Sequence, residues 1–403
     1  MSLLARLEHT LAWRRARRIL AVRLDNLGDV LMTTPALSAL AGASTQTSTQ
    51  TSGQAATRSV TLLASGANAA LLPHVTSIAD VIEFDAPWVA GAGHTTTDKS
   101  AAAVTLAAKH PAANERRLIA QLARRRFDAA VVFTACTQSA LPAALWCRLA
   151  GIPLRAAHSR ENPYGLLTDW VPDFDVSGPG LRHEVSRQLD LVNALGFPTR
   201  DAGLVFEYSA LQRDAALHKL VQSGGAVDKP WVVVHPGSTA ASRRYPPERF
   251  GQAARRIAAC SGAQIVFSGG VGDVEACAQA QRAMVEPSVS LAGRLELGEL
   301  GALIGGARLL VCNNSAPAHL AAAVGTPSVV LYALTNSQHT PWRAPGRVLN
   351  RDVPCRNCLK SVCPEGHHAC LLGVLPAEVA DAALDLWHKP PWRAARQPAM
   401  RTA

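Results

Sequence analysis

The chain has 403 residues, of which 48% are hydrophobic, 17% charged and 5% aromatic. At roughly 150 residues per domain, this length predicts two to three domains, each with its own core, and excludes a disordered tail or a small disulfide scaffold. The formal net charge of +10 favours anionic partners, whether nucleic acid, phosphorylated metabolites or an anionic membrane face.

The N-terminus predicts a short basic leader helix over residues 1–18 rather than a secretory signal, because its cations follow the apolar residues. No run of about eighteen apolar residues that would cross a membrane occurs, and we expect a cytoplasmic protein. The helix has one leucine face and ends in arginines: Leu3, Leu4, Leu7 and Leu11, then Arg14, Arg15, Arg17 and Arg18. This pattern suits the headgroup zone of an anionic inner-leaflet membrane, and a leader packed on the first domain is the alternative.

From residue 19 onward, apolar strands alternate with amphipathic helices, which is typical of a parallel sheet covered on both faces. The alternation weakens over residues 203–229 and then restarts with WVVVHPG. We therefore predict an α/β protein of two doubly wound, Rossmann-like domains, 19–215 and 216–375, facing each other across a cleft. A C-terminal helix and tail, 376–403, is expected to return to the first domain.

Two low-complexity segments, 45–57 and 90–112, are predicted to be surface loops. Ligands of doubly wound sheets bind beyond the carboxyl ends of the strands, so the strand-to-helix turns are the candidate sites. None of these turns carries the G-x-G-x-x-G dinucleotide fingerprint, and the glycine-rich stretch 268–273 lacks its third glycine. The absence of G-x-x-x-x-G-K-[ST] also excludes P-loop NTPases.

The first turn contains Asp25, Asn26, Gly28 and Asp29 at a helix start. The Asp29 carboxylate either caps backbone N–H groups or accepts a proton from a hydroxyl nucleophile, and both interpretations stay open. Asp25, Asn26 and Gly28 are candidates for the acceptor side of such a site.

Two turns of the second domain predict an anion site. Ser238 ends the turn HPGS, and Arg243 and Arg244 lead into the next helix; guanidinium groups and free N–H groups both bind phosphate oxygens. A solvated basic loop is the alternative. In Asn313-Asn314-Ser315-Ala316-Pro317-Ala318-His319, a helix start and an imidazole converge on one volume, which favours ligand contact over a structural histidine.

Together these turns resemble glycosyltransferase family 9, the ADP-heptose:lipopolysaccharide heptosyltransferases. The resemblance covers most of the chain, in the segments ILAVRLDNLGDVLMTTPAL, LAGIPLRAAHSRENPYGLLTDWV, VVVHPGSTAASRRYPPERF and NNSAPAHLAAAVGTPSVVLYALTN, with HTPW after them. It implies a GT-B fold, an acceptor-binding N-terminal domain, a C-terminal domain that binds a nucleotide-sugar donor, and inversion at the anomeric carbon.

The resemblance also assigns residues. The catalytic carboxylate of the G-D motif falls on Asp29, and the basic donor-binding residue falls on Arg243, with Arg244 adjacent. The donor motif D-[ST]-G-x-x-H falls on Asn314, Ser315, Ala316 and His319. Asn314 in place of aspartate removes a charge, and Ala316 in place of glycine adds a methyl where backbone should approach the donor, so the choice of sugar or nucleotide is in question. Tyr245 in place of the usual tryptophan is a milder change.

The implied reaction has Asp29 deprotonate an acceptor hydroxyl, which attacks the anomeric carbon while the nucleoside diphosphate leaves. Arg243, Arg244 and the helix start at Ser315 would stabilise the leaving group. No obligatory cofactor is expected. The acceptor implied by the family is the lipopolysaccharide inner core, an anionic glycolipid of the cytoplasmic leaflet, with which the positive charge agrees.

The cysteines fall into two groups. Five stand singly in apolar segments and are expected to be small buried hydrophobes: Cys136, Cys147, Cys260, Cys277 and Cys312. The others form a cluster with enough ligands for one structural zinc ion: Cys355, Cys358, Cys363 and Cys370, with His367 and His368 between them. Reduced thiols or a redox-labile disulfide are the alternatives.

Two other functions compete with heptose transfer. One is a family 9 enzyme with a different donor and acceptor, and the other is a noncatalytic nucleotide- or glycan-binding relative. Nucleic-acid binding is not expected, because the arginines are scattered and aromatic residues are few.

Overall fold

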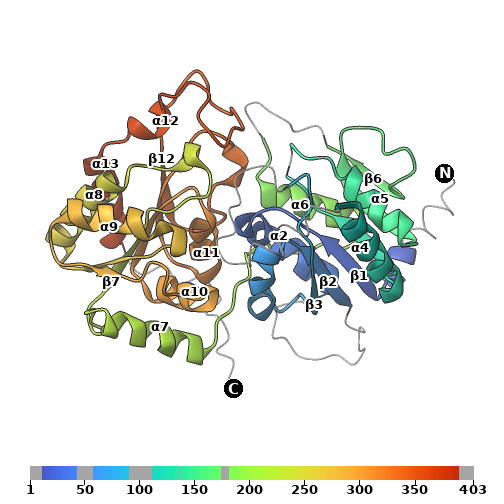
Figure 1. The fold of residues 1–403 in the computed structure, drawn as a ribbon, viewed down its shortest axis with the longest axis horizontal. Helices are drawn as coiled ribbons and strands as arrows, with labels where there is room; N and C mark the ends of the chain where they lie inside the picture. The colour runs from blue at the N-terminus through green and yellow to red at the C-terminus, as the bar shows by residue number, and fades with distance from the viewer. Residues whose placement is uncertain (1–10, 43–57, 90–110, 136, 174–180, 390–403) are drawn as a thin grey trace. The chain divides into compact units, whose positions relative to one another are not determined.

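A computed structural model describes residues 11–42, 58–89, 111–135, 137–173 and 181–389 (Figure 1). The chain divides into two compact units, residues 1–202 and 203–403. The predicted loop 45–57, residues 90–110 of the predicted loop 90–112, Cys136 and residues 1–10 lie outside the described residues. Residues 111 and 112, expected in that loop, begin helix α4. In the part of the chain that is described, no helix combines the length and the apolar character needed to span a bilayer.

The first unit is built on a six-stranded sheet in the order β3-β2-β1-β4-β5-β6, with every neighbouring pair parallel. Its strands are β1 (Arg18–Val22), β2 (Ser59–Ala64), β3 (Asp80–Glu83), β4 (Ala129–Val132), β5 (Leu154–Ser159) and β6 (Asp169–Pro172). Its helices are α2 (Leu27–Ala41), the 3-10 helix η1 (Gly66–His74), α4 (Pro111–Arg125), α5 (Leu141–Leu149) and α6 (Glu184–Ala194). The strand order reverses between β1 and β4, so their carboxyl ends mark the switch point where ligands of such sheets bind.

Both faces of this sheet are covered, as the continuous apolar strands predict. Leu20 and Val22 of β1 share one core with apolar residues of α4 and α5. The alternate residues Ile19 and Ala21 point to the other face and are fully buried as well.

The second unit repeats the architecture with the order β12-β11-β10-β7-β8-β9, again all parallel. Its strands are β7 (Trp231–His235), β8 (Gln264–Phe267), β9 (Val289–Ser290), β10 (Leu309–Asn313), β11 (Ser328–Leu331) and β12 (Gly346–Leu349). Its helices are α7 (Ala210–Gln222), α8 (Pro247–Ser261), α9 (Val274–Met284), α10 (Leu297–Gly306), α11 (Ala316–Val324), α12 (Ala369–Leu372) and α13 (Pro376–Trp387), with 3-10 helices η2 (Ala241–Arg243), η3 (Val271–Asp273) and η4 (Ser337–His339). Here the switch point lies between β7 and β10.

The region where the sequence pattern weakens contains α7, which Ser209 and Gln212 begin with a reciprocal capping box. Just before α7, two aromatic side chains lie against glycines of α10. A Cβ on Gly301 would lie 2.3 Å from the ring of Phe206, and one on Gly305 would lie 2.5 Å from the Tyr208 hydroxyl. Only glycine at these positions permits such close approach, so this segment belongs to the second unit.

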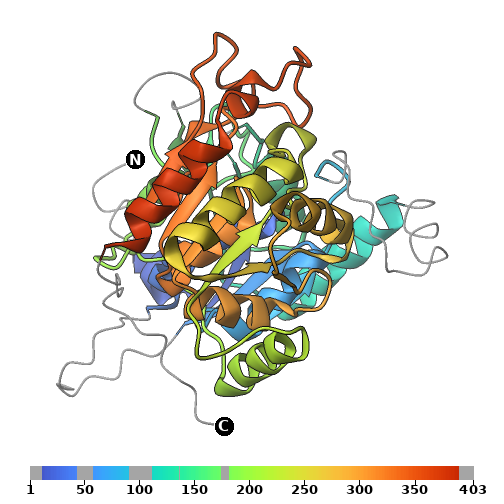
Figure 2. The ribbon, with the colours of Figure 1, turned by 90° about the vertical axis from the view of Figure 1, so that its left-hand side faces the viewer.

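The C-terminal helix differs from the expectation that it returns to the first domain. Figure 2 shows α13 beside α8 over the second sheet. Its apolar stripe explains this position, because Val379, Ala380 and Ala383 are fully buried in the core of the second unit. Residues 390–403 lie outside the described residues.

Two smaller expectations also meet the structure. Cys147, Cys277 and Cys312 are buried as predicted, but Cys260 is exposed because it lies on the outer face of α8.

In the leader, Trp13 is buried: its indole Nε1 donates to Asp169 Oδ2 at 2.9 Å and its ring meets Phe197 edge-on. The described end of the leader thus packs on the first unit, while its arginines are exposed.

Candidate functional site

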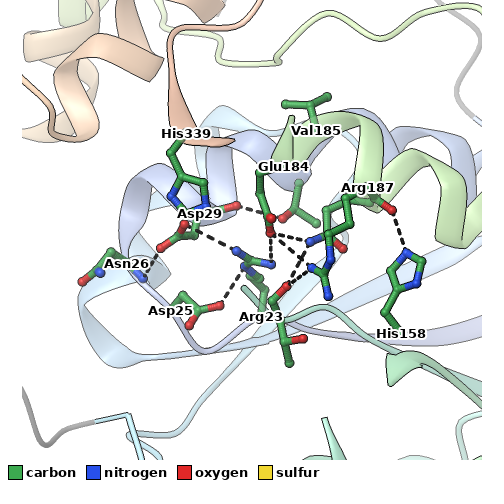
Figure 3. A network of polar contacts seen from close by, with 12 residues as sticks. Arg23, Asp25, Asn26, Asp29, His158, Glu184, Val185, Arg187 and His339 are labelled. Atoms are coloured by element: carbon green, nitrogen blue, oxygen red, sulfur yellow. Dashed lines mark hydrogen bonds and ion pairs between the residues drawn. The ribbon is translucent and has the colours of Figure 1, made fainter. Parts of the chain in front are cut away.

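Arg23 follows β1 directly and lies at the first switch point, fully buried among three carboxylates (Figure 3). Its Nε lies 3.0 Å from Asp25 Oδ2, and its two terminal nitrogens lie 3.4 Å from Asp29 Oδ1 and 3.0 Å from Glu184 Oε1. These carboxylates raise the pKa of Arg23 although burial opposes its charge. A permanent cation therefore holds three acidic side chains together at the edge of the sheet.

Helix α6 extends this network to the other strand ends. Arg187, one turn after Glu184, pairs with Asp173 beyond β6 at 2.7 Å and donates to the Thr134 carbonyl beyond β4. The Arg187 carbonyl is in turn 2.8 Å from His158 Nε2 at the end of β5. One helix thus fixes the carboxyl ends of several strands through buried polar contacts.

Asp29 occupies the third position of α2, and its two oxygens have different partners. Oδ2 accepts the backbone N–H of Asn26 at 3.2 Å, which is the capping geometry considered from the sequence. Oδ1 faces Arg23. The Asp29 carboxylate therefore caps the helix and lies at the switch point at the same time. It is partly exposed, whereas Gly28 before it is buried.

Asp25 has the more unusual environment. Burial raises its pKa from 3.8 to about 6, with the negative charge of Asp29 adding to the effect and Arg23 opposing it. Gln138 hydrogen-bonds the Asp25 side chain. Asn26, in contrast, is exposed and contributes its backbone to the turn.

A cavity of about 200 Å³ adjoins this network in the first unit. Its walls include Gln138, His158, Ser159, Glu161 and Asp173, which follow or end strands β4, β5 and β6. Burial and the nearby Arg187 lower the pKa of His158, so this imidazole is neutral near pH 7. Hydroxyl, amide and carboxylate groups around a hollow of this size are suited to a polyhydroxylated ligand.

In the second unit, Asn313 joins the turns at the switch point. It ends β10, is fully buried, donates from Nδ2 to the Pro236 carbonyl at 2.7 Å, and accepts the backbone N–H of Tyr245 at 3.0 Å. The turn after β7 and the turn that carries the paired arginines are therefore held against the end of β10. From the sequence, Asn313 is predicted only as part of the motif and not in this role.

The helix start after Asn313 brings together the predicted donor-binding residues. Asn314 is buried and its side-chain Nδ2 has no hydrogen-bond partner, although its backbone N–H continues the sheet to Leu331. Ser315 is the N-cap of α11, Ala316 its first residue, and His319 lies buried one turn in. A buried amide without a partner at a helix start is a common sign of a ligand position.

The two adjacent arginines have different roles. Arg244 is exposed and donates to the turn carbonyls of Ser238 at 2.7 Å and Thr239 at 3.2 Å. Arg243 is half-buried, and its Nε is buried without a hydrogen-bond partner. Arg243 thus has donor capacity available for an anion, whereas Arg244 stabilises the turn.

His235, at the end of β7, does not add positive charge to this site. Burial lowers its pKa to about 4, and its Nδ1 lies 3.1 Å from Ser268 Oγ. The imidazole is neutral at pH 7 and lies buried at the carboxyl end of β7.

The predicted cysteine cluster lies beside the arginine-bearing turn. Cys355, Cys358, Cys363 and Cys370 are all free thiols and line one cavity of about 20 Å³ together with Ser242 and His367. Within the described ranges, no set of three or more His, Cys, Asp or Glu side chains is already spaced to hold a metal ion.

Sequence reasoning missed Arg23, Glu184 and Arg187. Arg23 had a readable signal, since a charged residue ends an otherwise apolar strand just before the first turn. Glu184 had a weaker signal, an acidic residue at the start of a helix, where it is favourable for any helix. Nothing local indicates that these residues, 161 positions apart, form an ion pair.

The model of glycosyltransferase family 9 (heptosyltransferase) matches residues 115–369. Lipopolysaccharide heptosyltransferase 2 of Escherichia coli K12 is 26% identical over 274 residues, 66% of this chain and 77% of the relative. Lipopolysaccharide heptosyltransferase 3 of Escherichia coli is 30% identical over 168 residues, 40% and 47% of the two chains. Lipooligosaccharide heptosyltransferase 2 of Campylobacter jejuni is 25% identical over 127 residues, 30% and 40%. The match spans less than half the length of the last two relatives.

Among solved structures, a family 9 glycosyl transferase from Veillonella parvula superposes with a TM-score of 0.72 at 22% identity, covering 92% of this chain and 97% of that one. The ADP-heptose lipopolysaccharide heptosyltransferase II of Escherichia coli gives 0.66 at 20% identity, covering 92% and 98%. At this identity the likeness establishes the fold, and it confirms the expected GT-B architecture of two Rossmann-like domains.

Proposed function

Because the chain belongs to glycosyltransferase family 9, we propose that it transfers heptose from ADP-L-glycero-D-manno-heptose to the inner core of lipopolysaccharide, with inversion at the anomeric carbon. The relatives named as lipopolysaccharide heptosyltransferases support this donor and acceptor. The observation that carries the proposal is the position of Asp29 at the first switch point, where Arg23 and the Asn26 backbone orient its carboxylate.

In the proposed reaction, Asp29 accepts the proton of an acceptor hydroxyl, and the hydroxyl oxygen forms the new bond to the anomeric carbon. The bond between that carbon and the diphosphate oxygen breaks, and its electron pair leaves with the nucleoside diphosphate. The polar cavity beyond β4, β5 and β6 is our candidate for part of the acceptor site, because Gln138 belongs to its wall and hydrogen-bonds Asp25.

The leaving diphosphate gains negative charge as the bond breaks, so donor groups fixed in advance stabilise the transition state. We assign this role to Arg243, whose Nε is available, to the Asn314 amide and to the start of α11 at Ser315 and Ala316. In this assignment Arg244 and Ser238 act by shaping the turn, and Ala316 and His319 border the donor.

An anionic glycolipid acceptor also requires approach to a membrane. Arg14, Arg15, Arg17 and Arg18 are exposed, and we propose that they contact the anionic inner leaflet as a peripheral surface. The cytoplasmic location expected from the sequence is part of the same proposal.

The test is mass-spectrometric detection of heptose transfer from ADP-heptose to Kdo-lipid A. Asp29→Asn keeps an oxygen that can cap the Asn26 N–H but removes the base, so wild type should transfer and this variant should not. A matched control is Glu378→Gln, which changes a carboxylate in the equivalent capping position of α13, where it accepts the Leu375 N–H. Equal transfer by Asp29→Asn and wild type would disprove the role of Asp29.

A second candidate is the same enzyme class with a different donor, which Asn314 and Ala316 favour because they change the charge and the space at the helix start. A panel of ADP-, GDP- and UDP-sugars separates the two: transfer from another donor only would replace heptose in the proposal. A noncatalytic binding role predicts nucleotide binding without transfer from any donor, and an Asp29→Asn variant with an unchanged cellular phenotype.

A further inference from the structure

The segment between β12 and α12 lacks a core of its own. From Asn350 to His368 no side chain is buried, and the segment contains neither a helix nor a strand. Three of its residues, Asn357, Leu359 and His368, nevertheless adopt left-handed backbone conformations with φ between 47° and 59°. A non-glycine residue adopts such a conformation at a free-energy cost, so other interactions must hold this segment in shape.

The segment is attached by its backbone to the turn that carries Arg243. The Ser361 carbonyl accepts the Ser242 N–H at 2.9 Å, and the Lys360 carbonyl accepts the Ser242 hydroxyl at 2.8 Å. Two further bonds, from Asn357 N–H to Leu334 O at 2.7 Å and from Leu359 N–H to Thr335 O at 2.9 Å, attach it to the loop after β11. The position of Ser242, which immediately precedes Arg243, thus depends on a segment that has no core.

Four thiols line one cavity here, three of them from this segment and the fourth, Cys370, from α12. Cys355, Cys358, Cys363 and Cys370 line the same cavity of about 20 Å³, which has room for about one atom of the size of a water oxygen. Four thiolates around one small cavity would repel one another unless a cation lay between them.

His367 orients toward the same cavity. Its Nδ1 accepts the Ala369 N–H at 3.0 Å, so in the neutral ring the proton is on Nε2. Nε2 lies 3.9 Å from Cys355 Sγ and therefore presents an N–H group to this sulfur. An N–H facing sulfur stabilises a thiolate and suits a residue outside the ligand set, as in many thiolate metal sites.

We propose that Cys355, Cys358, Cys363 and Cys370 bind one thiophilic divalent metal ion, Zn²⁺ or Fe²⁺, as a closed tetrathiolate site. Four S–H groups each release a proton to solvent, and four sulfur–metal bonds form; no electron is transferred. The thiols would turn inward from the cavity wall to reach ligand distance, and four sulfurs complete a tetrahedral shell with no open position. The role of the site is to crosslink the segment from Asn350 to His368 (we call this the stapling role). Through its hydrogen bonds to Ser242, the crosslinked segment fixes the turn that carries Arg243.

Two disulfides are the competing crosslink. They would join the sulfurs in separate pairs, whereas the structure gathers all four around one cavity with His367 facing it. Intact-mass measurement on protein purified without reductant distinguishes the two, because each disulfide lowers the mass by two hydrogen atoms. A chain two disulfides lighter would overturn the proposal.

The first experiment is elemental analysis by inductively coupled plasma mass spectrometry of the full chain, purified without chelators or metal-affinity resin. We expect close to one equivalent of zinc plus iron in wild type and a loss of most of it in the double variant Cys355→Ser, Cys358→Ser. Cys260→Ser is the matched control, because Cys260 is a single exposed thiol on α8, and it should keep the metal. Wild type without metal, or the double variant with full metal, would overturn the site.

A second measurement does not depend on whether the double variant folds. Wild-type protein is titrated with a mercurial reagent while a chromophoric chelator reports released metal, and about four thiol equivalents should be consumed for each ion released. Release that requires no thiol consumption would indicate a metal bound elsewhere and would contradict the assignment.

The stapling role has its own readout. Calorimetric titration with ADP, GDP and UDP before and after metal release should show severalfold weaker binding of whichever nucleotide binds after release, because the turn of Arg243 loses its support. Unchanged affinity would disprove the stapling role. The metal content requires no turnover, so it can fail or succeed independently of the proposed heptosyltransferase activity.

Discussion

The guanidinium of Arg23 lies 3.0 Å from Asp25 and reaches Asp29 and Glu184 with its other nitrogens, so one buried cation contacts three carboxylates. Arg187, the next buried cation along α6, pairs with Asp173 and also approaches Glu184. Four carboxylates thus share two fully buried guanidinium groups, and the partly exposed Arg182 lies 3.6 Å from Asp173 as a third. The excess negative charge makes the network sensitive both to the loss of a cation and to pH.

Arg23→Met should destabilise the fold strongly. Removing one partner of a buried ion network leaves uncompensated carboxylates in the interior, which costs roughly 3–5 kcal/mol of unfolding free energy. Denaturant unfolding measures this loss. The control is Arg256→Met, whose ion pair with Asp381 is half-exposed on both sides and should be worth less than about 1 kcal/mol. A loss for Arg23→Met as small as that of the control would contradict the network.

Asp25 should make stability depend on pH in the acidic range. Its folded pKa of about 6 exceeds the ordinary value of 3.8, so the folded state holds this proton more tightly than the unfolded state. The contribution of the Asp25 carboxyl to the free energy of unfolding is therefore complete below about pH 4 and is lost as the pH rises through about 6. Asp25→Asn cannot lose the proton, so its unfolding free energy should improve relative to wild type from pH 4 toward neutrality. A difference between the two proteins that stays constant with pH would disprove this.

Much of the fold follows from local pattern. The apolar strands and the turns that follow them predicted two doubly wound sheets, because buried parallel strands need apolar residues on both faces. The same turns predicted Asp29 at a helix start and Asn314 after a strand, and the structure has Asp29 as the third residue of α2 and Asn314 directly after β10. Arg243, expected to lead into a helix, ends the 3-10 helix η2 just before α8. Their roles in binding and catalysis remain predictions.

What the pattern could not predict depends on contacts between distant residues. Arg23 and Glu184 pair across most of the first unit, and neither sequence neighbourhood specifies the other. The expectation that α13 returns to the first domain differs from its packing in the second unit. Its apolar stripe indicates that the helix is buried, but the surface on which it packs is set by the side chains of α8. In the same way, Cys260 has apolar neighbours in sequence, yet the helical period turns it outward.

Two adjacent asparagines should respond in opposite ways to alanine substitution. Asn313→Ala leaves the Pro236 carbonyl and the Tyr245 N–H unpaired, which costs roughly 1–3 kcal/mol for each buried group. Asn314→Ala removes an amide nitrogen that has no partner, so stability should be unchanged or improved while nucleotide affinity falls. Thermal unfolding and calorimetric nucleotide titration of both variants test this contrast. A destabilised Asn314→Ala with full affinity would show that Asn314 is structural.

The paired arginines provide the sharpest test of the donor site. Arg243→Ala should weaken nucleoside diphosphate binding by roughly 10- to 100-fold, the worth of a charge-assisted hydrogen bond to phosphate, with little effect on stability. Arg244→Ala removes two bonds to the exposed turn carbonyls of Ser238 and Thr239, so its effect on affinity should be much smaller. Calorimetric titration at two salt concentrations checks this. If Arg243 contacts the phosphate directly, its loss should also make the nucleotide affinity depend less on salt concentration. If the two variants bind equally well, or if Arg244→Ala is the weaker binder, then Arg243 does not contact the diphosphate and the anion site is held by the turn as a whole.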